Sequence, residues 1–211
     1  MFDVCVIGHV TKDIVRIKNA EKMMPGGVAY YFSIALKSLG LNIYLITKSS
    51  KQDKYLLNNL YKEKIKTFYK ESKETSYFEN IYLLDTDIRA QNVKSVADSF
   101  CLEDIPNINS KIYHLGPLTK EDISIETIKH LSQKGKISLD IQGFLREVKN
   151  NKVNSVDWEK KREGFAYIDI LKADEEEAKI LSGEDNIKKA AIRLSAYGIG
   201  EVIITLRNKG S

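Results

Sequence analysis

The chain has 211 residues, of which 43% are hydrophobic and 29% charged, a composition typical of a globular domain and not of a disordered protein. Its net charge of +4 comes from 33 basic and 29 acidic residues that are interleaved along most of the chain, so we expect no nucleic-acid partner. The two cysteines and three scattered histidines predict neither a disulfide framework nor a metal cluster, and without a long apolar run we expect no membrane span and a cytoplasmic protein.

The first predicted element is a strand. Residues 2–7 form a short apolar run with Asp3 near its start, which is typical of a buried parallel strand and not of a signal peptide. The turn over residues 8–13 lacks the Gly-x-Gly-x-x-Gly spacing of dinucleotide-binding folds, which disfavours a dehydrogenase. Residues 14–24 alternate loosely and are interpreted as an edge strand.

A pair of glycines introduces the first predicted helix. Gly26 and Gly27 precede a segment with apolar residues at positions 28, 32, 35, 36 and 39, which is helical spacing, and Gly40 is placed to end the helix. Two glycines at a helix N-terminus allow a ligand to approach unpaired backbone N–H groups. A plain loop-to-helix junction explains the same spacing, so the pattern alone leaves both interpretations open.

Strand and helix patterns alternate through the rest of the chain. The sequence predicts a strand over 42–47, a helix over 54–61, and strands over 77–84 and 88–96 joined as a hairpin by a turn at 85–87. It then predicts strands over 111–116, 136–140, 165–172 and 201–206, separated by helices over 121–133, 175–181 and 187–197. Such alternation predicts a mostly parallel sheet with helices on both faces.

Polar residues or glycines follow nearly every predicted strand. In such sheets ligands bind beyond the carboxyl ends of the strands, so these residues are candidates to line one crevice, although strand-to-loop transitions are often polar anyway. They are Asp13, Thr47, Gly116, Asp140, Gln142, Asp174 and Thr205.

The acidic run from Asp174 to Glu177 has two interpretations. Asp-x-x-Glu at the start of a helix is a capping box, and acidic residues there interact favourably with the helix dipole. Carboxylate oxygens are also suitable partners for Mg²⁺, which keeps several of its own waters.

The run from Gly26-Gly27 to Leu39-Gly40 resembles the first signature of the ribokinase-like (PfkB) family of sugar and nucleoside kinases. The resemblance implies an α/β fold, with a three-layer, doubly wound, mostly parallel sheet and a small projecting β-lid, lacking its C-terminal part. It implies a single incomplete domain over residues 1–211, with lid strands inserted at about 14–24 and 76–96.

The resemblance assigns several residues to the acceptor substrate. Asp13 would hold hydroxyl groups of the acceptor, and the Gly26-Gly27 turn would pack against it. Tyr31 stands where many members carry an Asn that bonds a substrate hydroxyl, which makes ribose a doubtful substrate. Arg89 and Gln142 would also face the acceptor, while a surface position on the hairpin is the alternative for Arg89.

The resemblance also implies a donor side that binds ATP with Mg²⁺. Glu177 would help to organise Mg²⁺ through water, and Arg146 would contact phosphate or form an ion pair within its loop. Arg207 stands where the first glycine of the family's Thr-x-Gly-x-x-Gly turn is usual, and its side chain would either crowd the phosphate or contact it. The other residues expected on this side are Asp140, Asp174, Thr205 and Gly210.

The implied activity is ATP-dependent phosphorylation of a hydroxyl group on a small sugar, polyol or nucleoside. The family's Gly-x-Gly-Asp motif, whose Asp is the catalytic base, does not occur, so we expect the base beyond Ser211 and no phosphate transfer by the chain alone. The alternative is a non-catalytic small-molecule-binding protein or a pseudokinase completed by a partner. A homodimer through the lid is a further implication.

Overall fold

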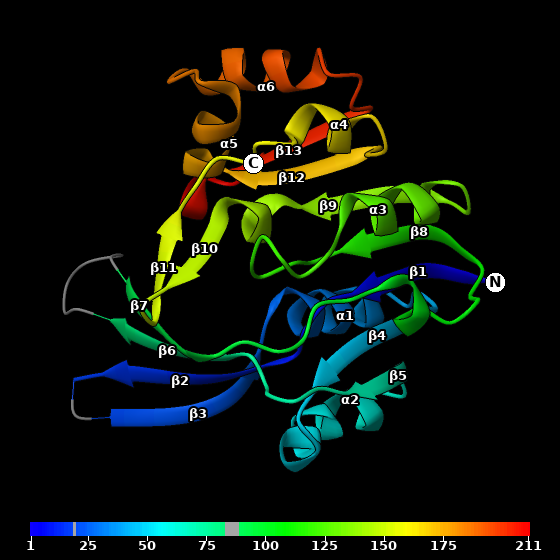
Figure 1. Cartoon of the computed structure of the whole chain (residues 1–211), viewed down its shortest axis with the longest axis vertical. Coiled ribbons are helices and arrows are strands. Elements are labelled where there is room, and N and C mark those ends of the chain that lie inside the picture. Colours follow the sequence, from blue (N-terminus) through cyan, green and yellow to red (C-terminus); the bar gives the residue numbers. More distant parts are fainter. Residues whose placement is uncertain (19, 83–88) are drawn as a thin grey trace.

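The computed structural model describes residues 1–18, 20–82 and 89–211. Its centre is a sheet of seven strands in the order β13-β12-β9-β8-β1-β4-β5, and all neighbouring strands in it are parallel (Figure 1). The strands are β1 (Phe2–Ile7), β4 (Ile43–Ser49), β5 (Lys66–Glu71), β8 (Ser110–Leu115), β9 (Lys136–Asp140), β12 (Ile170–Asp174) and β13 (Glu201–Thr205).

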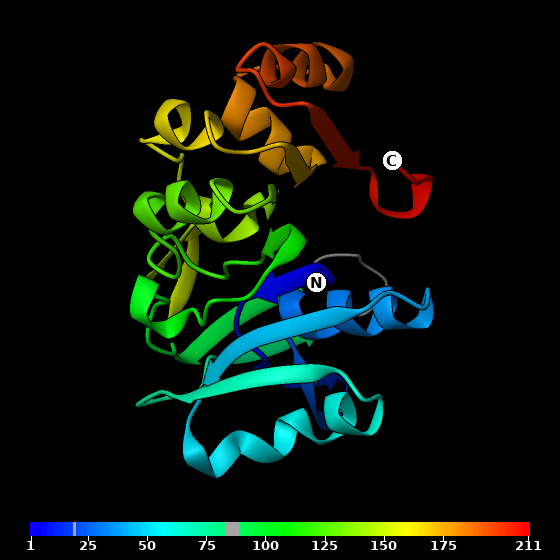
Figure 2. The same ribbon diagram turned by 90° about the vertical axis from the view of Figure 1, so that its right-hand side faces the viewer.

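Helices cover both faces of this sheet, as the sequence predicts. Side chains alternate along β1, so that Val4 and Val6 pack toward α1 (Val28–Ser38) and α2 (Asn58–Lys62), while Cys5 and Ile7 join the core on the opposite face. Figure 2 shows α1 on one side of the sheet and the helices α3 and α4 on the other. The core that contains Cys5 and Ile7 is the larger one. The helices that contribute to it are α3 (Ile125–Ser132), α4 (Lys161–Phe165), α5 (Glu175–Ser182) and α6 (Ile187–Ser195).

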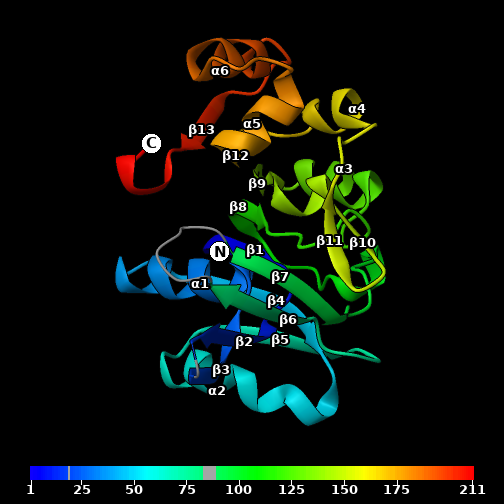
Figure 3. The same ribbon diagram turned by 90° about the vertical axis from the view of Figure 1, so that its left-hand side faces the viewer.

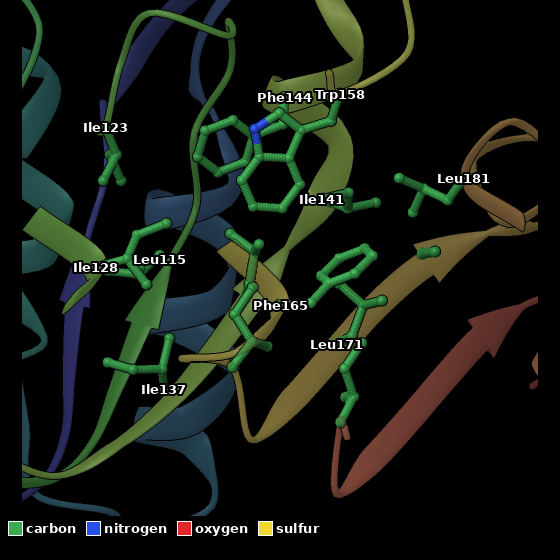
Figure 4. Packing of buried hydrophobic residues seen from close by; sticks show 14 of the residues in the cluster. Leu115, Ile123, Ile128, Ile137, Ile141, Phe144, Trp158, Phe165, Leu171 and Leu181 are labelled. Carbon is green, nitrogen blue, oxygen red and sulfur yellow. The ribbon is translucent and has the colours of Figure 1, made fainter. Parts of the chain in front are cut away.

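The larger core is built around aromatic stacking. Phe144 stacks on Trp158 with ring centroids 4.3 Å apart, and Phe165 meets the same indole edge-on at 5.4 Å (Figure 4). Ile128 from α3 and Leu181 from α5 belong to the same cluster. This core therefore packs the helices of this face against the strands of the central sheet.

A second sheet projects from the carboxyl ends of the central strands (Figures 1 and 3). Its order is β10-β11-β7-β6-β2-β3, with β2 and β6 parallel and the other neighbours antiparallel. The strands of this sheet, which we call the lid sheet, are β2 (Thr11–Ile17), β3 (Ala20–Gly26), β6 (Tyr77–Tyr82), β7 (Arg89–Ser95), β10 (Arg146–Lys149) and β11 (Lys152–Ser155).

The lid sheet differs from the sequence prediction in its details. The expected single edge strand over 14–24 is a hairpin, β2 and β3, in which β3 is the edge. The hairpin predicted over 77–96 is present as β6 and β7, and its expected turn at 85–87 lies outside the described residues. The sequence did not predict β10 and β11, because each is only four residues long and largely polar.

Three predicted elements of the central domain were wrong in part. The helix expected over 54–61 is a 3-10 helix, η1 (Lys51–Leu57), followed by α2. The helix expected from residue 121 begins at Ile125, because Ser124 caps it by accepting the Thr127 N–H at 3.1 Å. The strand expected over 165–172 begins only at Ile170, since the short apolar run at residues 165–168 does not by itself distinguish a strand from the end of a helix. The strand β5, absent from the prediction, is a charged edge strand.

No helix within the described residues combines the length and the apolar character needed to cross a membrane.

A buried ion cluster joins two neighbouring strands. Asp104 is 1% exposed and pairs with Lys48 of β4 at 2.5 Å and with Lys70 of β5. Burial alone would favour the neutral acid, but contacts from Cys101 and both lysines lower the pKa of Asp104 below its ordinary value. Because Lys48 is itself 5% exposed, its ammonium depends on this carboxylate for compensation.

We expect Asp104→Ala to destabilise the chain by about 3 kcal/mol, because it leaves the buried Lys48 ammonium without its counter-charge. Urea unfolding measures this change, and Glu103→Ala, at the neighbouring exposed position, is the control with an expected loss below about 0.5 kcal/mol. Equal losses for the two variants would show that the ion cluster contributes nothing specific.

Candidate functional site

A cavity of about 480 Å³ lies where the N-terminus of α1, the lid sheet and the end of β9 meet. It brings together six residues that the sequence analysis names as candidates, namely Asp13, Gly27, Tyr31, Asp140, Gln142 and Arg146. The rest of its lining is Thr11, Val28, Phe32, Ala35, Phe78, Gln91 and Leu118. We call this space the acceptor cavity, after the role that the resemblance predicts for Asp13 and Gly27.

The glycine pair and Asp13 are fitted closely to each other. The Thr11 hydroxyl donates to Asp13 Oδ1 at 2.6 Å, and a Cβ atom on Gly26 would lie 2.3 Å from Asp13 Oδ2. Gly27 has φ 88°, and a Cβ there would lie 2.4 Å from the carbonyl oxygen of His9. A side chain at Gly26 would therefore displace the Asp13 carboxylate, and the backbone conformation at Gly27 favours glycine.

The strands β6, β7 and β10 extend the wall of the cavity beside Asp13, because they belong to the same lid sheet as β2. Arg146 Nη1 donates to Gln91 Oε1 at 3.4 Å, and Gln91 Nε2 donates to Asn80 Oδ1 at 2.8 Å. Phe78 and Leu118, both buried, add apolar surface. Sequence analysis did not identify Gln91, Phe78 or Leu118 as site residues. The two-residue period places Phe78 on the same face of β6 as Asn80, but only the pairing of Asn80 with Gln91 brings Gln91 to that face.

Two further acceptor-side candidates have different placements. Tyr31 is 51% exposed at the cavity margin, and its hydroxyl donates to the carbonyl oxygen of Pro25 at 3.4 Å. Arg89 begins β7, and its side chain lies outside the described part of the chain.

Asp140 lines more than one space. The sequence predicts it for the donor side, and it lines both the acceptor cavity and a neighbouring apolar groove of about 420 Å³ between α1 and the central sheet. Its Oδ1 accepts the Gln142 N–H at 3.1 Å, and its Oδ2 pairs with Lys172 at 3.1 Å. Asp140 therefore joins the acceptor cavity to the ends of the neighbouring strands.

The acidic run at the start of α5 forms the capping box. Asp174 Oδ1 accepts the Glu177 N–H at 2.8 Å, and Glu177 Oε2 accepts the Asp174 N–H at 2.7 Å. Gly183, with φ 71°, ends the helix. Burial raises the pKa of Glu177 to about 7.

The carboxylates near Glu177 do not fit direct metal ligation. In the described ranges, no three His, Cys, Asp or Glu side chains are grouped so that they could hold a metal ion. Glu177 and Asp174 are occupied by each other's backbone, and Asp140 by Lys172. A contact of Glu177 with Mg²⁺ through water stays a prediction.

The last donor-side candidates surround the end of β13. Thr205 pairs in register with Asp174, and its hydroxyl donates to the carbonyl oxygen of Ala173 at 3.5 Å. Arg207 has φ 54° and Gly210 has φ 93°, so Arg207 adopts the left-handed conformation that glycine favours. The lining of the acceptor cavity includes none of Asp174, Glu177, Thr205 and Gly210, which are all described residues.

The Glu177 carboxyl predicts a pH-dependent stability. Its pKa rises from 4.5 to about 7 on folding, so the folded chain holds this proton more tightly and loses stability as pH rises between those values. We expect Glu177→Gln, which retains an oxygen for the Asp174 N–H, to be more stable than the parent by on the order of 2 kcal/mol at pH 8. The advantage should shrink toward zero at pH 4.5 in urea unfolding.

The control is Glu176→Gln, at an exposed side chain of the same turn, which should change stability equally at both pH values. A constant difference between Glu177→Gln and the parent across this pH range would contradict the assignment.

Comparisons with known proteins agree with this geometry. The family model described as pfkB family carbohydrate kinase matches residues 1–211. The cytidine kinase of Thermococcus kodakarensis is 26% identical over 219 residues, covering 100% of this chain and 75% of that protein. Among solved structures, a sulfate complex of a pyrophosphate-dependent kinase in the ribokinase family is 28% identical with a TM-score of 0.90, covering 96% of this chain and 72% of the other.

A second similar structure comes from work that converted a pyrophosphate-dependent myo-inositol-1 kinase into a myo-inositol-3 kinase by two substitutions. It is 27% identical with a TM-score of 0.87, and covers 96% of this chain and 70% of that one. The match of the family model along the whole chain is decisive. This chain belongs to the PfkB family of carbohydrate kinases, which are phosphotransferases that act on hydroxyl groups.

Proposed function

We propose that the acceptor cavity binds a small polyol, sugar or nucleoside and presents one of its hydroxyl groups for phosphorylation. The observation that carries this proposal is the Asp13 carboxylate, packed on Gly26 and lining a cavity of about 480 Å³. A carboxylate accepts hydrogen bonds from hydroxyl groups with charge assistance. Relatives named for cytidine and myo-inositol, both polyhydroxylated, agree with an acceptor of this class.

Two kinds of polar group have complementary tasks in this proposal. Asp13 accepts hydrogen bonds from hydroxyl groups, while Arg146 and Gln142 line the cavity with N–H donors. Phe32 and Phe78 supply apolar surface for the carbon skeleton of a ring. Holding the acceptor at several points fixes the reacting hydroxyl before phosphate transfer, and a lid over it excludes water that would compete for the phosphoryl group.

For the donor we propose ATP with Mg²⁺, bound at the carboxyl ends of β9, β12 and β13. These strands are neighbours in the central sheet, so Asp140, Asp174 and Thr205 follow one another along its edge. Glu177 would contact Mg²⁺ only through water, and Gly210 would form the turn beside the phosphates. Because the carboxylates do not form a direct metal site, we derive no reaction step from the metal.

Pyrophosphate is the second candidate donor, and similarity to pyrophosphate-dependent kinases favours it. Arg207 and Lys209 form a basic, exposed turn after β13, which suits a small polyanion. Isothermal titration calorimetry of the chain with ATP and with pyrophosphate, each in the presence of myo-inositol or cytidine, distinguishes the donors by their Kd values.

The myo-inositol relative also bears on the regiochemistry of the proposed reaction. Its two substitutions are eleven positions apart and change which hydroxyl is phosphorylated. In this chain Asn80 and Gln91 have the same spacing of 11 and face each other on β6 and β7. Dimerisation through the lid sheet, a cytoplasmic location and a contact of Arg89 with the acceptor stay predictions.

The proposal predicts that myo-inositol or cytidine raises the melting temperature and that Asp13→Ala removes the shift. At a ligand concentration about 100-fold above Kd, binding adds about 2.7 kcal/mol, which corresponds to roughly 5 °C or more for a chain of this size. Differential scanning fluorimetry measures it. Asp53→Ala is the matched control, since Asp53 pairs with Lys12 at 3.3 Å outside the cavity and should leave the shift unchanged. An undiminished shift in Asp13→Ala would overturn the role of Asp13.

A further inference from the structure

We propose that the amide pair Asn80–Gln91 determines the orientation in which the acceptor binds, and hence which of its hydroxyl groups is presented for phosphorylation. This inference rests on the proposed function and adds positioning residues that set specificity. Neither residue carries out a chemical step.

The pair is built into the wall of the acceptor cavity. Asn80 on β6 is 3% exposed, and its cross-strand partner Gln91 on β7 lines the cavity. Their side chains are joined by a hydrogen bond of 2.8 Å from Gln91 Nε2 to Asn80 Oδ1. A hydrogen bond between a buried and a half-buried amide restricts both side chains, because breaking it would leave the buried Asn80 oxygen without this partner.

Arg146 fixes the polarity of this chain of hydrogen bonds. A guanidinium only donates, so the Gln91 atom that faces Arg146 Nη1 at 3.4 Å is the carbonyl oxygen. The amide nitrogen of Gln91 must then face Asn80, which in turn must present its own oxygen. The orientation of the two amides therefore follows from one cation on β10. The three side chains form a continuous hydrogen-bonded chain from β6 through β7 to β10.

The cavity consequently offers the acceptor hydrogen-bonding groups of opposite character, held by different strands of the lid sheet. Asp13 accepts, whereas Arg146 only donates and Gln91 presents an amide of fixed orientation. A polyhydroxylated ring has inequivalent hydroxyl groups. Only a few of its orientations therefore form hydrogen bonds both with Asp13 and with the Arg146 and Gln91 side chains. Leucine at positions 80 and 91 would remove the polar surface and its fixed orientation, and other ring orientations would become competitive.

A neighbouring pair provides the structural comparison. Glu79 and Asn92 are also cross-strand partners on β6 and β7, joined at 3.0 Å, and neither lines the acceptor cavity. Arg16 and Lys94 pair with Glu79 at 2.8 and 3.6 Å. This outer pair holds the same two strands together without facing the acceptor, so it separates a structural effect from a specificity effect.

The test measures Kd by isothermal titration calorimetry for myo-inositol and D-chiro-inositol, which have the same atoms but differ in hydroxyl orientation. Cytidine and its 2′-epimer form a second pair of probes. We expect the ratio of the two Kd values within at least one pair to change by about fivefold or more in the double variant Asn80→Leu/Gln91→Leu, as the loss of one or more hydrogen bonds would give. The control Asn92→Leu should keep each ratio within about twofold of the parent.

Gln91→Leu alone, at a half-buried position, is the second variant, in case the double variant does not fold, and the same direction of change is expected. Unchanged ratios in folded Gln91→Leu would overturn the inference. If Asp13→Ala abolishes binding while the leucine variants keep the parent's ratios, only this inference fails. If the parent binds none of the four probes, the proposed function fails and this inference fails with it.

Discussion

The close packing of a carboxylate on a glycine is the constraint on which the site depends. Asp13 touches the backbone at Gly26, and Gly27 turns the chain into α1 with a positive φ. Any side chain at Gly26 would displace the carboxylate, and any at Gly27 would strain the turn against His9. The two glycines therefore place an accepting group beside the N-terminus of a helix, at the carboxyl end of β1.

The rest of the fold brings N–H donors, on Gln91 and Arg146, to the same cavity. The lid sheet is continuous from β3 to β10, so side chains that are far apart in sequence face one cavity. Asp140 then links this cavity to the strand ends where we expect the phosphate donor. An acceptor side and a donor side that meet at one residue are what phosphoryl transfer needs, because the reaction depends mainly on positioning.

The sequence was informative where a pattern is local. The glycine pair, the capping box of Asp174 and Glu177, and the apolar strands of the central sheet are each encoded within a few residues. The sequence was uninformative where the structure depends on pairing between strands. The contact between Asp13 and Gly26 needs the hairpin of β2 and β3, and the Asn80–Gln91 pair needs the register of β6 and β7. No single stretch of sequence contains either register.

The most direct test of the account is a crystal structure of the chain grown with myo-inositol or cytidine. The account predicts ligand density in the acceptor cavity, with a hydroxyl group within hydrogen-bonding distance of the Asp13 carboxylate and the ring between Gly27 and Gln91. Density only in the groove between α1 and the central sheet, or in the acceptor cavity without contact to Asp13, would contradict it.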